Sequence, residues 1–110
     1  MADLTVNKAV RDGAVQCTTA SGAATQTFMY DTEDEKTAVI IENSGSAAAS
    51  VTVKAGDGLR SSIGDLTVSV EAGKTAVIGP LDSMRFKNMS TGKVTVAISG
   101  GTTTINVISL

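Results

Sequence analysis

Four acidic side chains gather in one short stretch of the sequence, and carboxylate oxygens are the ligands that calcium prefers. They are Asp31, Glu33, Asp34 and Glu35. An EF-hand loop that began at Asp31 would need a glycine at its sixth position, and Lys36 stands there. Asp57 and Asp65 flank a glycine-rich loop and offer similar oxygen ligands. We expect a solvated acidic loop at residues 31–35 and no metal site, with cation binding as the alternative.

Two further groups of residues resemble catalytic or nucleotide-binding elements but lack the partners that such chemistry needs. Cys17 is the single cysteine, no histidine is present to act as its base, and residues 15–19 carry no charge. The sequence Gly73-Lys74-Thr75 resembles the end of a phosphate-binding loop, but Val68 stands where that loop needs its first glycine. We therefore predict an inert cysteine, a turn at Gly73, and a protein that is not an enzyme and has no cofactor or small-molecule substrate.

The composition argues against two further classes of partner. The net charge is −2, and nucleic-acid binding surfaces show a strong basic excess instead. The sequence has no run of about 18 apolar residues of the kind that crosses a membrane as a helix. Its three aromatic residues, Phe28, Tyr30 and Phe86, occur in strand-like alternation, so we expect them in the core rather than on a binding platform. These observations predict no nucleic-acid and no membrane partner.

The elements that must position these residues are β-strands. The chain of 110 residues contains 15 Thr, 12 Val and 7 Ile, which favour strands, and 11 Gly but one Pro, which favour frequent turns. Apolar and polar residues alternate in short runs separated by turn signals at a spacing typical of sandwiches. The sequence predicts an all-β protein: a single antiparallel β-sandwich of about seven to nine strands, formed by residues 28–110. Residues 1–27 are expected to form an N-terminal arm or an edge strand.

The alternation also predicts particular elements. Residues 37–42 are apolar on both faces and predict a central strand covered twice. Met84 and Phe86 alternate with Arg85 and Lys87 and predict a strand, and a corner between sheets is expected at residues 79–81. We predict a core that includes one apolar member from each main strand: Ile41, Val53, Val68, Ile78, Phe86 and Val96.

The order of the segments resembles a group of small head proteins of tailed bacteriophages. Those proteins open with an "LTV…R.G" stretch, continue with a central strand ending in "N-G/S-G", a "VTV" strand and a "TV.V.AG…IGP" segment, and close with an "N..G.V.V" strand. The matching residues here are 2–6 with 10–13, 39–45, 51–53, 67–73 with 78–80, and 88–96. The resemblance implies a virion structural protein, a capsid decoration or cement protein. Its expected partners are the major capsid protein and further copies of itself on the shell. It would lie on the capsid exterior after synthesis in the bacterial host cytoplasm.

Two alternatives remain open at this point, a β-module of the phage tail or baseplate, and a carbohydrate-binding or adhesion module. For a decoration protein, the N-terminal segment is the candidate site of contact with the capsid or with a neighbouring subunit, because an extended segment adds a strand to a sheet edge through main-chain hydrogen bonds. The candidate residues are Leu4, Val6, Lys8, Val10 and Arg11. An ordinary first strand of the same sandwich is the competing interpretation of this segment.

Overall fold

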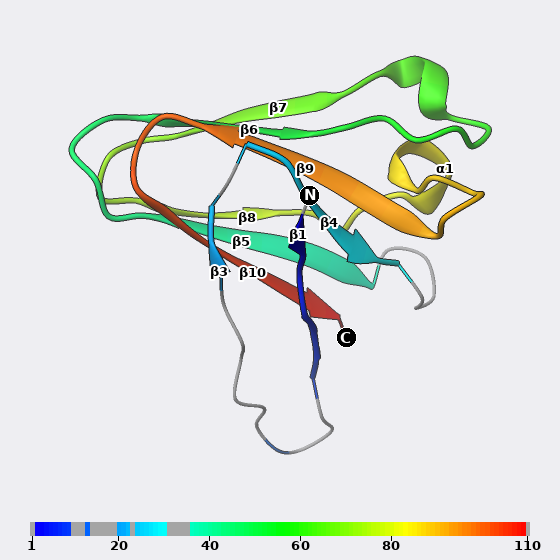
Figure 1. Ribbon diagram of the computed structural model, residues 1–110, viewed down its shortest axis with the longest axis horizontal. Coiled ribbons are helices and arrows are strands. Elements are labelled where there is room, and N and C mark those ends of the chain that lie inside the picture. The colour runs from blue at the N-terminus through cyan, green and yellow to red at the C-terminus, as the bar shows by residue number, and fades with distance from the viewer. Residues whose placement is uncertain (1, 10–12, 14–19, 23, 31–35, 110) are drawn as a thin grey trace.

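Alternating apolar residues place the strands in two β-sheets that pack face to face (Figure 1). The computed structural model describes residues 2–9, 13, 20–22, 24–30 and 36–109. Sheet A contains, in spatial order, β1 (Ala2–Asp3), β4 (Gln26–Met29), β9 (Lys93–Ser99), β6 (Ala49–Val53) and β7 (Leu66–Val70). Sheet B contains β2 (Val6–Lys8), β10 (Thr103–Ser109), β5 (Thr37–Asn43) and β8 (Thr75–Ile78), with β3 (Ala20–Ser21) also paired to β10. The predicted β-sandwich is confirmed.

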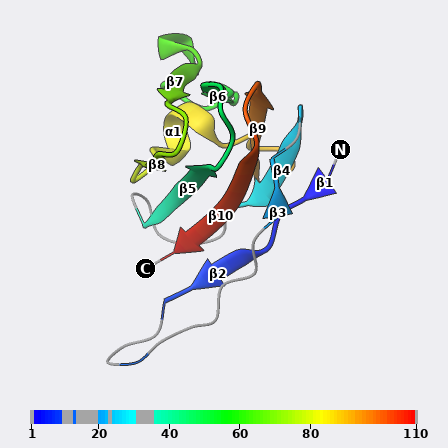
Figure 2. The ribbon, with the colours of Figure 1, turned by 90° about the vertical axis from the view of Figure 1, so that its left-hand side faces the viewer.

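The strand pairs differ in direction between the body and the N-terminal edge. The pairs that β4, β5, β6, β7, β8, β9 and β10 make with one another are antiparallel. In contrast, β1 lies parallel to β4, and β2 lies parallel to β10 (Figure 2). Residues 2–8 therefore pair with one edge of each sheet, and they do so through short ladders of two and three residue pairs.

The core lies between the sheets and is built from the inward-facing member of each alternation. In β9, for example, Val94, Val96 and Ile98 are buried. The buried apolar residues form one cluster: Phe28, Tyr30, Val39, Ile41, Ala49, Val51, Val53, Val70, Ile78, Leu81, Phe86, Val94, Val96, Ile98, Ile105 and Val107. Burial is confirmed for the predicted core residues with one exception. Val68 is only half-buried, because its strand β7 is the last strand of sheet A and has a neighbour on one side only among the described residues.

The apolar run at residues 37–42 forms β5, which lies between β10 and β8. Its central position is as predicted, and Val39 and Ile41 are fully buried against sheet A. The second face is not covered in the way the sequence suggested, since Ala38 and Ile40 are only half-buried. On this outer face Ile40 lies beside Val77 of β8, so neighbouring apolar side chains cover it in part.

The strand predicted around Met84 and Phe86 is wrong, because Ser83–Phe86 forms a short helix, α1. Asp82 caps this helix: its carboxylate accepts a hydrogen bond of 2.9 Å from the backbone N–H of Met84. Phe86 is buried all the same, because the helix turns it into the core. The chain reaches α1 through the corner at Gly79–Pro80, which leads from β8 in sheet B toward β9 in sheet A, as predicted.

Three links between the sheets meet at one end of the sandwich, at the left of Figure 1. They join β5 to β6, β7 to β8 and β9 to β10, and the buried side chain of Asn43 contacts all three. Its amide nitrogen donates to the carbonyl oxygens of Ala47 (2.8 Å) and Val70 (3.0 Å). Its amide oxygen accepts from the backbone N–H groups of Gly45 (3.1 Å) and Thr102 (3.2 Å). One side chain thereby fixes the positions of the three links relative to one another.

Candidate interaction sites at the sheet edges

The N-terminal segment runs from the edge of sheet A to the edge of sheet B. After β1, the N–H of Leu4 donates to the carbonyl oxygen of Thr27 in sheet A at 2.6 Å. After β2, the N–H of Ala9 donates to the carbonyl oxygen of Ser109 in sheet B at 2.7 Å. The segment thus covers one open side of the sandwich, and its backbone bonds both sheets (Figure 2).

The structure divides the predicted contact residues into two kinds. Leu4 and Val6 are half-buried and pack against the core, so they stabilise the chain's own sandwich. Lys8 is exposed at the end of β2. Val10 and Arg11 lie outside the described residues. Leu4 and Val6 therefore face the core, whereas Lys8 is accessible to a partner.

Asn7 also belongs to this edge, although the alternation of Leu4 and Val6 with Thr5 and Asn7 gave it no role beyond a polar position. Its side chain is buried and donates from Nδ2 to Oδ1 of Asn106 at 2.8 Å and to the carbonyl oxygen of Val107 at 3.1 Å. These two bonds anchor β2 on β10 next to its backbone pairs. The sequence marked Asn7 only as a polar position beside Val6, and its partner 99 positions away was not apparent.

A second short segment closes the rest of the same edge. β3 pairs with β10 at Ala20 and Ser21, and the N–H of Gly22 donates to the carbonyl oxygen of Thr103 at 2.9 Å. The side chain of Gln26 donates to the carbonyl oxygen of Ser21 at 2.9 Å and connects this segment to β4. β2 and β3 together pair with the outer side of β10 along most of its length.

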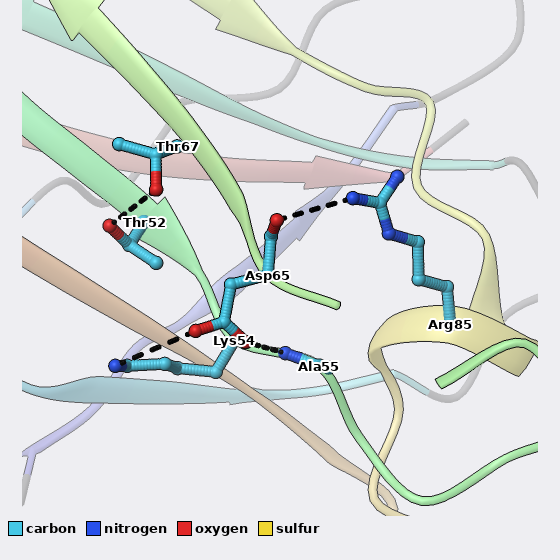
Figure 3. A network of polar contacts seen from close by, with 6 residues as sticks. All are labelled: Thr52, Lys54, Ala55, Asp65, Thr67 and Arg85. Carbon is cyan, nitrogen blue, oxygen red and sulfur yellow. Dashed lines mark hydrogen bonds and ion pairs between the residues drawn. The ribbon is translucent and has the colours of Figure 1, made fainter. Parts of the chain in front are cut away.

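A lobe at the opposite end from the three links is formed by residues 54–65 and α1. It contains the 3-10 helix η1 (Ser61–Ile63), and a network of polar contacts holds it in place (Figure 3). Arg85 of α1 donates from Nε to the carbonyl oxygen of Gly64 (3.0 Å) and from Nη2 to that of Asp65 (3.3 Å). Asp65 accepts from the N–H of Ala55 at 2.7 Å and lies 3.8 Å from Nζ of Lys54.

Further contacts hold residues 54–65 of the lobe against α1 and against the segment that leads to β9. Arg60 forms an ion pair of 2.9 Å with Asp82, and its backbone N–H donates to the carbonyl oxygen of Met84. The carboxylate of Asp57 accepts from the N–H of Met89 at 2.7 Å. Asp57 and Asp65, which the sequence offered as cation ligands, thus bind backbone N–H groups and serve to position the lobe.

The lobe also presents large apolar side chains to solvent. Leu59 is 90% exposed and Ile63 is 60% exposed, and Met89 nearby is 44% exposed. Because the backbone on both sides of Leu59 is hydrogen-bonded to α1, these side chains stand on a fixed support. These side chains are therefore accessible to a partner.

The remaining candidate residues lie in one link of the sandwich or outside the described residues. Gly73 and Lys74 lie in the link between β7 and β8, which fits the predicted turn. Cys17 and the acidic residues 31–35 lie outside the described residues. Within the described part of the chain, no three His, Cys, Asp or Glu side chains are grouped so that they could hold a metal ion. The helices of the same part are too short to cross a membrane.

Comparison of the chain with protein-family models, with curated proteins and with solved structures finds no match.

Proposed function

We propose that this chain is a capsid decoration protein of a tailed bacteriophage, a non-enzymatic protein that binds the outer surface of the major capsid protein and stabilises the shell. The observation that carries this proposal is the order of its segments, which resembles that of small phage head proteins along nearly the whole chain. Each of the resembling segments from residue 39 onward forms a strand or a link of the sandwich. The proposal therefore rests on the order of these segments in the sequence.

The N-terminal edge supplies the capsid contact in this proposal. Its ladders to β4 and β10 are short, and Lys8 is exposed at the end of the second ladder. Arg11 follows three positions later and is the other cation of the first 27 residues. Two cations separated by three positions in the sequence suit an acidic shell surface, since charge complementarity steers association and main-chain pairing supplies affinity.

The effect on the capsid follows from linkage. A protein that binds the assembled shell and not its dissociated parts shifts the equilibrium toward the shell. Many copies of modest individual affinity suffice, because the capsid lattice repeats the binding site. The protein would be made in the bacterial host cytoplasm and would end on the capsid exterior.

The experiment that tests the location is a count of copies per virion. Quantitative mass spectrometry of phage particles produced from the genome that encodes this chain gives its ratio to the major capsid protein, and cryo-electron microscopy places it. We expect hundreds of copies on the outer shell. A dozen copies or fewer at the tail would identify a tail or baseplate module instead. Absence from the particle together with binding on a glycan array would identify an adhesion module, and either result overturns the proposal.

A charge-reversal experiment tests the contact itself. The double variant Lys8→Glu with Arg11→Glu is mixed with expanded, undecorated capsids, and bound protein is measured after sedimentation. We expect at least about a tenfold loss of affinity, since like charges then face the shell. Lys74→Glu is the matched control, because Lys74 is also exposed but lies at the end with the three links. Equal binding of the double variant and the control would exclude the N-terminal edge as the anchor.

A further inference from the structure

β7 is an edge strand with one free side. It pairs with β6, and no strand of the described residues pairs with its other side. At the opposite edges, β4 is covered by β1 and β10 by β2 and β3, which are strands of only two or three residues. β8 is also an open edge, but it has four residues and is followed by Gly79–Pro80, after which the N–H of Leu81 bonds back to Thr37. β7 is therefore the longest open edge of the described sandwich.

This strand lacks the devices that normally protect an open edge. Edge strands are usually blunted by charged residues, by proline or by bulges, because their unpaired N–H and C=O groups attract other strands. β7 reads Leu-Thr-Val-Ser-Val and contains neither a charged residue nor a proline. Its register with β6 runs through five consecutive residue pairs without a bulge.

The side chains beside this edge are incompletely buried. Leu66 and Val68 face the core but are only half-buried. Just before β7, Ile63 and Leu59 are largely exposed, and η1, which carries Ile63, lies beyond the start of the strand in Figure 1. A strand placed against β7 would shield Leu66 and Val68 from solvent, and apolar contacts at Ile63 would extend the interface.

The residues of β7 complement a second copy of the same strand. In an antiparallel pair about a two-fold axis at Thr67, Leu66 lies opposite Val68 of the other copy, and Asp65 lies opposite Ser69. Apolar residues then meet on the inner face, and a carboxylate meets a hydroxyl on the outer face. The facing threonines would repeat a contact already present inside the molecule, where the hydroxyls of Thr52 and Thr67 are 3.2 Å apart (Figure 3).

Neighbouring registers are less favourable. An axis at Val68 would place Asp65 opposite Glu71, and like charges directly opposite are destabilising. An axis at Ser69 would move Leu66 opposite Ala72, which lies beyond the end of β7. The axis at Thr67 keeps Leu66, Thr67 and Val68 opposite one another and avoids the pairing of Asp65 with Glu71.

From these observations we infer that β7 is a self-association edge: two copies of this chain pair through β7 about an axis at Thr67 to form one continuous ten-stranded sheet, with Ile63 and Leu59 at the ends of the interface. The contact is short, so the dimer is concentration-dependent rather than permanent. This inference goes beyond the proposed function, and its test uses the isolated chain, so that either can fail without the other.

Sedimentation velocity of the full chain from about 10 μM to about 1 mM measures the association. We expect a monomer–dimer equilibrium in that range. Thr67→Lys places two lysines opposite each other and should raise the dimer dissociation constant by about tenfold or more. Ser69→Lys is the matched control: it adds the same charge to the same exposed face, but the new lysine meets Asp65 of the other copy. Its dissociation constant should stay within about threefold of the original or fall.

Ile63→Ser gives a second perturbation outside the strand, at a side chain that is 60% exposed, and should weaken the dimer several-fold while the far-UV circular dichroism spectrum stays unchanged. Thr67→Lys also removes the contact with Thr52 and could fail to fold for that reason. In that case Ile63→Ser alone tests the interface. A chain that remains monomeric up to about 1 mM overturns the inference. So does a dimer that responds equally to Thr67→Lys and Ser69→Lys, or that Ile63→Ser leaves unchanged.

Discussion

Replacing Asn43 by alanine should destabilise the sandwich more than any other polar substitution at the end with the three links. The change removes four hydrogen bonds, two donated to Ala47 and Val70 and two accepted from Gly45 and Thr102. Alanine fills little of the space, so the four backbone groups must find water or remain unpaired.

The magnitude follows from where those backbone groups lie. The bond to Val70 is buried, and a buried acceptor that loses its partner costs about 1–3 kcal/mol. The other three bonds are only partly buried, so water can replace them at a cost of roughly 0.5–1 kcal/mol each. Because the four bonds share one side chain, their costs do not add fully, and we expect a loss of about 2–4 kcal/mol. That is a large part of the roughly 5–15 kcal/mol that holds a domain together.

Urea unfolding followed by circular dichroism measures this change as a shift of the midpoint at constant slope. Ser44→Ala is the matched control, since Ser44 is the next residue, is exposed and makes one long bond of 3.4 Å to Thr102. We expect the control to change stability by less than about 0.5 kcal/mol. Equal midpoints for the two variants would refute the role assigned to Asn43.

A double-mutant cycle with Gly101→Ala tests the same geometry from the other side. A Cβ at Gly101 would lie 2.8 Å from Oδ1 of Asn43, and Gly101 has a φ of 63°, where alanine is strained. Part of the cost of Gly101→Ala should therefore disappear when Asn43 is already alanine, because the contact with the amide is gone. Strict additivity of the two substitutions would contradict the close approach.

Three further substitutions test the core, the N-terminal edge and the cysteine. Phe86→Ala should cost about 3–5 kcal/mol in urea unfolding, since the ring is buried, and an unchanged midpoint would show the burial to be wrong. Leu4→Ala should cost about 1 kcal/mol in the same assay, because the side chain is half-buried, whereas Lys8→Ala should leave stability unchanged. Cys17→Ser should change stability by less than about 0.5 kcal/mol, and a Cys17–Cys17 disulfide between native subunits, detected by non-reducing electrophoresis, would contradict its predicted inertness.

Local patterns predicted the strands well where the alternation was long. Val94, Val96 and Ile98 alternate with smaller or polar residues, and β9 follows that pattern to its end. At Met84 and Phe86 the same alternation gave a wrong prediction of a strand, because two apolar residues two positions apart fit a helical turn as well as a strand. The capping residue Asp82 was the signal that distinguished the two.

The alternation of apolar and polar residues did not show which strands would lie at the edges of the sheets. β6 and β7 have the same alternation, yet Val53 is fully buried in an inner strand and Val68 is half-buried in an outer one. The difference depends on which strands lie beside each of them, and those neighbours come from distant parts of the sequence. The role of Asn7 was hidden for the same reason, because its partner belongs to β10. The candidate edges therefore emerged from the topology, whereas the candidate cation Lys8 emerged from the sequence.

The N-terminal edge begins with β1 at one end of sheet A, whereas β7 lies at the other end, and this placement has a consequence for avidity. β1 is the first strand of that sheet and β7 is the last. A dimer joined through β7 would place the two N-terminal edges at the far ends of a ten-stranded sheet, roughly 40 Å apart at the usual spacing between strands. Neither contact would block the other, so a dimer could engage two sites on a repeating surface at once. Binding of the first edge would then raise the effective concentration of the second, and a weak dimer would bind such a surface more tightly than its single contacts suggest. Thr67→Lys should accordingly weaken the attachment to capsids as well as the dimer, although Lys8 and Arg11 remain intact.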